Sequence, residues 1–540
     1  MREKSSSTKG FMILSLAGII AKVLSAFYVP LLTRIIGTDG VGIYSRSYEV
    51  FMFVYALTSM GCQPAVAKIV AEIRALGNEK DAIKALKVSR KIYGIVGLVL
   101  SILVIVIAGP LTNLIKISNA KFAIMFLAPS IVLTAILSAY RGYFQGKDEM
   151  TGIAISQVLE QILNVVVSLL FAFLFIHISE PMGAAGGTIG TSVGALIAIF
   201  YLIYVYDKKK FEEEILTENL HEKRVTTKTI VRKLIRYGLP ITLSAGIQNF
   251  GGLVDMANVN LRLLSAGFTI NQSDTLYGLY YQYKTLLGVP LIIVTALTTI
   301  ILPAVSKAYA LKDRKQIKRS TNFAFRITFA ITIPAAFGLA ILSDDIYTIL
   351  YGSSQGAYLM SLGSIILILM AIAQVEGVIL QGISRFYPMI ISFSIGIIFK
   401  ILANYIFVGI REINIMGVLI GNFLCYLLPV IINHRIIRKA IRARIPMVRN
   451  CVKPVIASVC MVIVIFLLKQ PIEILGSFIG TAKIVVFIYT LIYTMILVAI
   501  GGFVYVYVMI VLGGIRKLDI EAVSPRVYKI LPRFIRKKIR

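Results

Sequence analysis

The sequence contains no tryptophan, and only three histidines and four cysteines occur among its 540 residues. Zinc catalysis has little support, because zinc sites draw on His and Cys ligands at close spacing. Disulfides are not expected either, since Cys62, Cys425, Cys451 and Cys460 lie in or beside apolar runs. Without Trp, any aromatic belt at a membrane surface must consist of the 27 tyrosines.

Charged residues are also few, at 15%, whereas hydrophobic residues make up 58% of the chain. A soluble core cannot bury so much apolar surface, so lipid must be the solvent. The net charge of +30 comes from basic residues dispersed over many short connections, which argues against nucleic-acid binding. The composition therefore predicts an all-α integral membrane protein.

Apolar runs of the ~20 residues that cross a bilayer recur along the whole chain. Every second connection between them is basic, so the positive-inside rule predicts that both termini are cytoplasmic. We therefore expect a multi-pass protein of a cytoplasmic membrane. About fourteen transmembrane helices are predicted, near 11–36, 41–67, 91–113, 121–141, 152–177, 186–206, 237–262, 277–303, 322–343, 357–382, 388–408, 415–434, 451–470 and 484–512.

Short motifs recur in the second half of the chain. Gly42-Ile43-Tyr44 matches Gly278-Leu279-Tyr280, and Phe144-Gln145-Gly146 matches Leu380-Gln381-Gly382, both 236 residues later. Six spans separate the matched elements, so two six-helix lobes are expected in a parallel repeat, with substrate between them. The predicted parts are an N-lobe at 1–206, a cytosolic linker at 207–236, a C-lobe at 237–436, two further helices at 437–512 and a basic cytosolic tail at 513–540.

Basic side chains occur inside the predicted spans of both halves, where an unpaired charge costs at least ~2.5 kcal/mol. They either line a cavity that attracts an anionic substrate, or they snorkel and form structural ion pairs. Arg46 and Glu49, three residues apart on a helix, could pair with each other. The candidate cavity residues are Lys22, Arg34, Arg46, Glu49, Arg262, Lys284 and Lys400.

Acidic side chains lie at membrane depth as well, at Asp255, Glu160 and Glu376. They either bind a coupling cation, Na⁺ or H⁺, or balance the basic residues, and their spacing does not choose between these roles. Asp255 is the first candidate for an ion site. No resident cofactor, metal or catalytic residue is expected.

Four stretches carry a family resemblance: RGYFQG at 141–146, SQVLEQ at 156–161, LYG at 276–278 and LPAVSKA at 302–308. Through them the chain resembles the polysaccharide-transporter branch of the multidrug, oligosaccharidyl-lipid and polysaccharide exporter superfamily. The resemblance is greatest to the stage V sporulation protein B group, which includes lipid II flippases of the MurJ type. It implies a two-lobed bundle that moves an undecaprenyl-pyrophosphate-linked glycan precursor outward by alternating access, for cell-wall, spore-cortex or envelope polysaccharide synthesis.

The same resemblance extends to single residues. Lys22 and Arg34 match basic cavity positions in the first helix of lipid II flippases, and Lys400 keeps a basic position of the second lobe. Asn164 stands where relatives often have Arg. The resemblance implies a transporter rather than an enzyme.

Two other functions remain open. A cation-coupled exporter of drugs or metabolites would have the same fold but favour an acidic, aromatic cavity, and the basic residues favour the flippase. A membrane glycosyltransferase or ligase would need a catalytic cluster in a sizeable outward loop, whereas the outward loops here have roughly a dozen residues or fewer.

The expected partners are a lipid-linked oligosaccharide and membrane lipids, and the chain is expected to be a monomer.

Overall fold

The computed structural model describes residues 2–213, 224–442, 446–477 and 483–514. These residues form α-helices with short 3₁₀ and π segments, and no strand occurs among them. Residues 214–223 of the predicted linker and 515–540 of the predicted tail lie outside the described part. The chain divides into two compact units, Met1–Thr285 with Ile401–Ile420, and Leu286–Lys400 with Gly421–Arg540. The predicted lobe boundaries stay a prediction.

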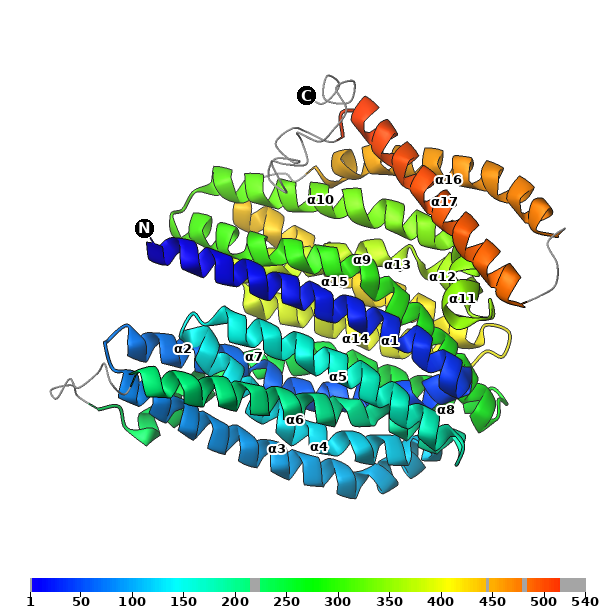
Figure 1. The fold of residues 1–540 in the computed structure, drawn as a ribbon. Coiled ribbons are helices and arrows are strands. Elements are labelled where there is room, and N and C mark those ends of the chain that lie inside the picture. The colour runs from blue at the N-terminus through cyan, green and yellow to red at the C-terminus, as the bar shows by residue number, and fades with distance from the viewer. Residues whose placement is uncertain (1, 214–223, 443–445, 478–482, 515–540) are drawn as a thin grey trace. The chain divides into compact units, whose positions relative to one another are not determined.

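Unit 1 begins with a very long helix, α1 (Arg2–Tyr55), that bends at Gly37 (φ 73°, ψ 177°), a conformation that favours glycine. The chain turns back there, so that α2 lies at the end of unit 1 from which α1 starts (Figure 1). The elements that follow are η1 (Ala56–Met60), α2 (Cys62–Arg74), α3 (Glu79–Ile115), η2 (Ser118–Ala120), α4 (Lys121–Gly146), α5 (Met150–Ile176), α6 (Glu180–Glu213), α7 (Thr227–Val254), η3 (Asp255–Val259), α8 (Asn260–Ser265) and the first part of α9 (Ile270–Ala310).

The RGYFQG stretch ends α4 and packs against α2. A Cβ at Gly142 would lie 2.7 Å from the carbonyl oxygen of Gln63, and one at Gly146 would lie 2.7 Å from that of Ala67. The two glycines, four residues apart, therefore share one face of α4 and let the helix backbones approach closely. Tyr140 on α4 belongs to the buried apolar cluster around this contact.

Unit 2 contains the rest of α9 and most of the later helices. Its last two helices are held to α11 by polar contacts, because Lys469 Nζ lies 2.7 Å from Asp345 Oδ2 and Tyr493 donates to Asp345 Oδ1. The remaining elements of the chain are α10 (Arg314–Ile341), α11 (Ser343–Tyr351), α12 (Ala357–Gly363), α13 (Ile366–Gly382), α14 (Phe386–Phe407), η4 (Asn414–Met416), α15 (Gly417–Ile441), α16 (Met447–Ser477) and α17 (Lys483–Val511).

Eleven helices of the described part are long and apolar enough to cross a membrane, and the bent pair α12 and α13 makes twelve if it forms one span. The candidate span Leu16–Arg74 covers most of the first predicted span, 11–36, and all of the second, 41–67. The predicted seventh span coincides with α7, η3 and α8, which are less apolar because Gln, Asn and Asp interrupt them. Every predicted span thus coincides with helix, and an all-α fold with about fourteen spans is confirmed.

Packing repeats between the two halves of the sequence. Gly186 on α6 lies against the backbone of Phe171 on α5, and Gly417 on α15 lies against the backbone of Phe407 on α14. The two phenylalanines are 236 residues apart, the spacing of the sequence repeat. Equivalent helices therefore use equivalent glycines for close contact, which supports a duplicated fold.

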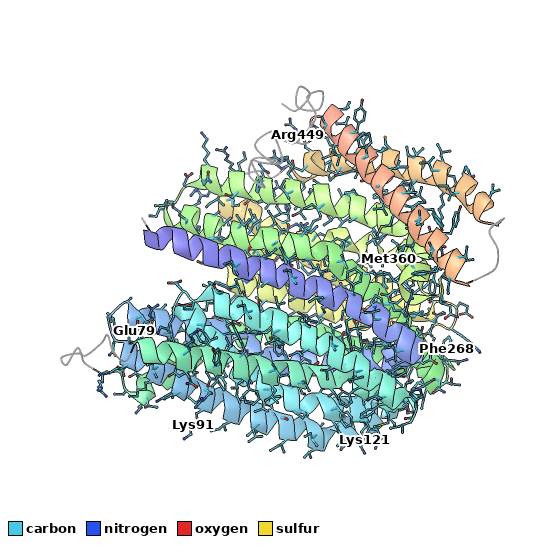
Figure 2. The ribbon with its side chains drawn as sticks, viewed as in Figure 1. Glu79, Lys91, Lys121, Phe268, Met360 and Arg449 are labelled. Carbon is cyan, nitrogen blue, oxygen red and sulfur yellow. The ribbon has the colours of Figure 1, made fainter. Side chains whose placement is uncertain are left out.

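The connections of unit 1 alternate between its two ends. Glu79, the first residue of α3, lies at one end, and Lys121 and Phe268 lie at the other (Figure 2). The charge alternation predicts the cytoplasmic side for Glu79 and the outer side for Lys121 and Phe268. We call the end with Lys121 and Phe268 the predicted outer end.

Candidate functional site: a polar junction between the repeats

The two copies of the repeated glycine motif meet where α1 crosses α9. Gly42 lies against the backbone oxygen of Asp274, and Gly278 lies against that of Thr38, so a Cβ at either glycine would collide with a carbonyl group. Thr38 lies four residues before Gly42, and Asp274 lies four residues before Gly278. The separation is 236 residues both between Thr38 and Asp274 and between Gly42 and Gly278. The crossing is therefore locally two-fold, as a parallel repeat requires.

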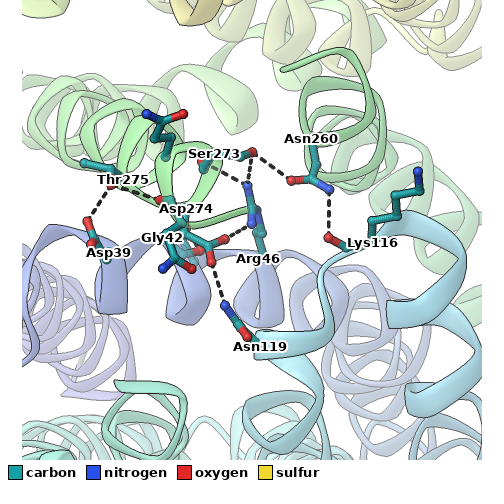
Figure 3. Close-up of polar contacts among 12 residues, drawn as sticks. Asp39, Gly42, Arg46, Lys116, Asn119, Asn260, Ser273, Asp274 and Thr275 are labelled. Carbon is teal, nitrogen blue, oxygen red and sulfur yellow. Dashed lines mark hydrogen bonds and ion pairs between the residues drawn. The ribbon is translucent and has the colours of Figure 1, made fainter. Parts of the chain in front are cut away.

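Arg46 is anchored beside this crossing. Its side chain is 1% exposed and forms an ion pair with Asp274, whose side chain is 2% exposed (Figure 3). Arg46 Nη2 also donates to the backbone oxygen of Ser273 at 3.0 Å and to its Oγ at 2.9 Å. The guanidinium lies 5.0 Å from the ring centroid of Tyr277. These contacts satisfy a charge that would be costly to bury alone.

Two asparagines extend the Arg46 contacts to neighbouring connections. Asn119 donates to Asp274 Oδ2 at 3.0 Å. Ser273 Oγ donates to Asn260 Oδ1 at 2.8 Å, and Asn260 Nδ2 donates to the carbonyl oxygen of Ile115 at 2.6 Å (Figure 3). The connection between α3 and α4, helix α8 and the start of α9 are thereby joined.

A further hydrogen bond links two equivalent positions of the repeat. Thr275 Oγ1 donates to Asp39 Oδ1 at 2.6 Å, and these residues are 236 apart in the sequence (Figure 3). Three connections that were predicted to face outward therefore meet in one polar network, in which Arg46, Asn260, Ser273 and Asp274 are buried. We call this network the outer junction; it comprises Asp39, Gly42, Arg46, Asn119, Asn260, Ser273, Asp274, Thr275 and Gly278.

Glu49 and Lys284 form a second ion pair between α1 and α9. Glu49 is buried, whereas the Lys284 side chain is 41% exposed. Gly252 on α7 leaves room for the carboxylate, since a Cβ there would collide with Glu49 Oε2. Arg46 and Glu49 thus pair across helices rather than with each other, because both of their partners lie on α9.

The other predicted basic residues have varied surroundings. Arg262 on α8 stacks over Tyr405, with 4.2 Å between its guanidinium carbon and the ring centroid. Lys22 and Arg34 are exposed on α1. Lys400 is buried on α14 and belongs to unit 2. Binding of substrate by these residues stays a prediction.

Asp255 and Glu160, two of the predicted ion-site acids, both have hydrogen-bond partners in unit 1. Asp255 is 1% exposed and accepts 3.0 Å hydrogen bonds from Asn404 Nδ2 and from the Tyr280 hydroxyl. Glu160 accepts a hydrogen bond of 2.7 Å from Arg141. The Arg141 contact favours a structural role for Glu160, whereas the Asp255 carboxylate has only uncharged donors, an amide and a phenol, among these hydrogen bonds.

Sequence reasoning missed several members of the outer junction. Asp274, Asn119, Asn260 and Ser273 are not among the predicted site residues. A signal existed for Asp274, because it precedes Gly278 as Thr38 precedes Gly42. The amide side chains carry no such pattern.

The helices and their repeated packing define a multi-pass membrane protein made of two related helix sets. The sequence model of one family, described as polysaccharide biosynthesis protein, matches residues 7–309. The chain belongs to this family, which lies in the exporter superfamily that the motifs indicate.

Individual relatives are similar over most of the chain. The lipid II flippase MurJ of Bacillus subtilis (strain 168) is 23% identical over 544 residues, which cover 95% of this chain and 97% of that protein. Stage V sporulation protein B of the same organism is 25% identical over 356 residues, or 66% of this chain and 68% of that protein.

Solved structures show the same fold. The structure described as lipid II flippase MurJ in an inward closed conformation has a TM-score of 0.67 at 17% identity, covering 92% of this chain and 98% of that one. An inward-facing multidrug resistance transporter of the MATE family has a TM-score of 0.64 at 14% identity, covering 78% and 94%.

Proposed function

We propose that the chain is a flippase that moves an undecaprenyl-pyrophosphate-linked glycan precursor from the inner to the outer leaflet by alternating access. It would work in the bacterial cytoplasmic membrane, with both termini in the cytoplasm and no chemistry on its substrate. The precursor would serve cell-wall, spore-cortex or envelope polysaccharide synthesis.

The observation that supports this most directly is the outer junction. The two repeats meet there through an ion pair, hydrogen bonds and two glycines. Polar groups can exchange such contacts for water when the helices part, whereas an apolar core would resist exposure. A junction of this kind suits a transporter that closes its outer end and later opens it.

The basic residues supply the chemistry that a pyrophosphate needs. Lys22 lies in the first helix and Lys400 in the second half, both at predicted membrane depth. A phosphate that leaves water must regain charged hydrogen-bond donors, each worth about 1.5–3 kcal/mol. We assign Lys22 and Lys400 to substrate binding, with Arg34, Arg262 and Lys284 as further members.

Replacing Lys22 or Lys400 with alanine is expected to reduce flipping of lipid II by about ten- to hundredfold, because one charge-assisted hydrogen bond to phosphate is lost. The measurement is transport in reconstituted vesicles, with exposed Lys121→Ala as the matched control. If transport is undiminished in both the Lys22 and the Lys400 variant, these two lysines do not bind the substrate. Replacement by arginine keeps the charge and should retain part of the activity.

Complementation of a bacterial strain depleted of its own lipid II flippase tests the substrate class. Growth rescued by this chain would support lipid II or a close analogue. Failure with normal membrane insertion would favour a sporulation or capsule precursor.

Asp255 supports a coupling cation within the same proposal. Its carboxylate and the hydroxyl of Tyr280 are oxygen donors of the type that Na⁺ accepts, and the carboxylate could equally bind H⁺. The same cluster is the observation that favours a cation-coupled exporter as the second candidate. Export of a drug without any flipping of lipid II would select that alternative.

A further inference from the structure

Unit 2 contains a buried carboxyl group, that of Glu376, to which the proposed function assigns no role. Glu376 on α13 is 0% exposed, and neither of its carboxyl oxygens has a hydrogen-bond partner. A carboxylate in such a place lacks the donors that normally stabilise its charge. Gly377, the next residue, is closely packed, since a Cβ there would lie 3.4 Å from the sulfur of Met389 on α14.

A titratable side chain adjoins Glu376. His434 on α15 places its Nδ1 3.4 Å from Glu376 Oε1. The His434 side chain is 20% exposed, whereas that of Glu376 is fully buried. The imidazole therefore lies between the carboxyl group and the surface of unit 2, where a proton carrier would have to lie.

Val375, the residue before Glu376, belongs to an apolar cluster of unit 2. The buried side chains of this cluster come from α9, α10, α13, α14 and α15, for example Val294, Phe329, Met389 and Ile437. Among the described residues of these helices, counted from Leu286 onward in α9, Glu376 is the single acidic residue. The Lys and Arg residues on the same helices are Lys307, Arg314, Lys315, Lys318, Arg319, Arg326, Lys400, Arg435, Arg438 and Lys439, and Arg385 lies between α13 and α14.

We propose that Glu376 and His434 form a proton-binding pair. The carboxyl O–H proton passes to the imidazole nitrogen, which leaves a carboxylate beside an imidazolium, and the imidazolium then gives its proton to water. Before that release the pair carries no net charge in either arrangement. After it, the carboxylate stands alone among apolar side chains, so release requires water or a cationic side chain to enter.

That requirement couples the proton to the conformation of unit 2. Helices α13 and α15 must separate enough to solvate the charge, and protonation lets them close again. This step rests on the proposed function, because it names H⁺ as an ion that drives flipping. The proton site itself is independent of any substrate.

Infrared spectroscopy of the purified full chain in lipid nanodiscs tests the site without substrate. A carboxylic-acid C=O band should appear and disappear with pH, and Glu376→Gln should abolish it. Asp344→Asn, which removes an exposed carboxyl of unit 2, is the matched control and should leave the band unchanged. A spectrum that is unaltered in Glu376→Gln, or a band that never titrates, would overturn the proposal.

The role of His434 is tested by exchange kinetics. On transfer to D₂O the band shifts as the carboxyl proton is replaced, and His434→Gln should slow this shift by roughly tenfold or more, because the relay group is lost. An unchanged rate would exclude His434 from the path. Retained band intensity in His434→Gln shows that the variant is folded.

The transport arm uses vesicles with the membrane potential clamped and an imposed pH gradient. The rate at which the native chain flips lipid II should change with the pH gradient, whereas the rate of the Glu376→Gln variant should not. If flipping is absent while the infrared band titrates, the proposed function fails and the proton site stands. If flipping occurs without any titrating band, the proton site fails alone.

Discussion

Replacing Arg46 with alanine is expected to lower the free energy of unfolding by about 3–5 kcal/mol and to abolish flipping. The reason is that Asp274 would lose its counter-ion in a place that is 2% exposed, with Asn119 as its remaining side-chain donor. Ser273 would lose two hydrogen bonds as well. Chemical unfolding of the purified protein measures the first effect, and transport in reconstituted vesicles measures the second.

Arg74→Ala is the matched control for this prediction. Arg74 forms an ion pair with Glu79 at 2.6 Å, but the two side chains are 32% and 26% exposed. Such a pair contributes at most about 1 kcal/mol, because solvent screens it. If the free energy of unfolding falls equally in Arg46→Ala and Arg74→Ala, burial does not increase the contribution of the Arg46–Asp274 pair to stability.

A double variant separates stability from opening. Replacing Arg46 with methionine and Asp274 with leucine removes both charges, and buried ion pairs replaced in this way often leave a protein about as stable or up to ~4 kcal/mol more stable. We expect the double variant to regain its stability without regaining transport, since an apolar junction cannot become hydrated at small cost. Full transport by the double variant would contradict an opening role for the outer junction.

The helices were predictable from the sequence because each span needs a long apolar run, and lipid leaves few alternatives to helix. The bend at Gly37 falls in the gap between the first two predicted spans, 11–36 and 41–67. The sequence did not show that α1 runs on from the first span into the second, since helix ends depend on local contacts. Nor did apolar periodicity reveal α11, a short helix outside the predicted spans.

The candidate site was predictable only in part. Membrane depth singled out Arg46, Glu49, Lys284, Asp255 and Glu376 because a charge in an apolar run is conspicuous. Their partners were not conspicuous, since a loop aspartate, an asparagine or a histidine near a helix end has many roles. Pairing across helices depends on three-dimensional packing, which a single sequence does not specify.

Adding a methyl group at both repeat glycines is expected to destabilise the closed outer junction by about 2–6 kcal/mol in total, at ~1–3 kcal/mol for each overpacked contact. In Gly42→Ala/Gly278→Ala the new Cβ atoms would meet the backbone oxygens of Asp274 and Thr38. Backbone carbonyls cannot rotate away as side chains do, so α1 and α9 must move apart. A cysteine at Thr275 should then react faster with a thiol reagent that cannot cross the membrane.

The matched control is Gly18→Ala/Gly288→Ala, which adds one methyl group to each of the same two helices. A Cβ at either position meets no described atom within 4 Å. Alanine is the better helix former by about 1 kcal/mol, so the control should be as stable as the native chain or more so. The two double variants thus differ in the sign of their effect on stability. A crossing variant as stable as the control would mean that α1 and α9 do not need their close contact to close the outer end.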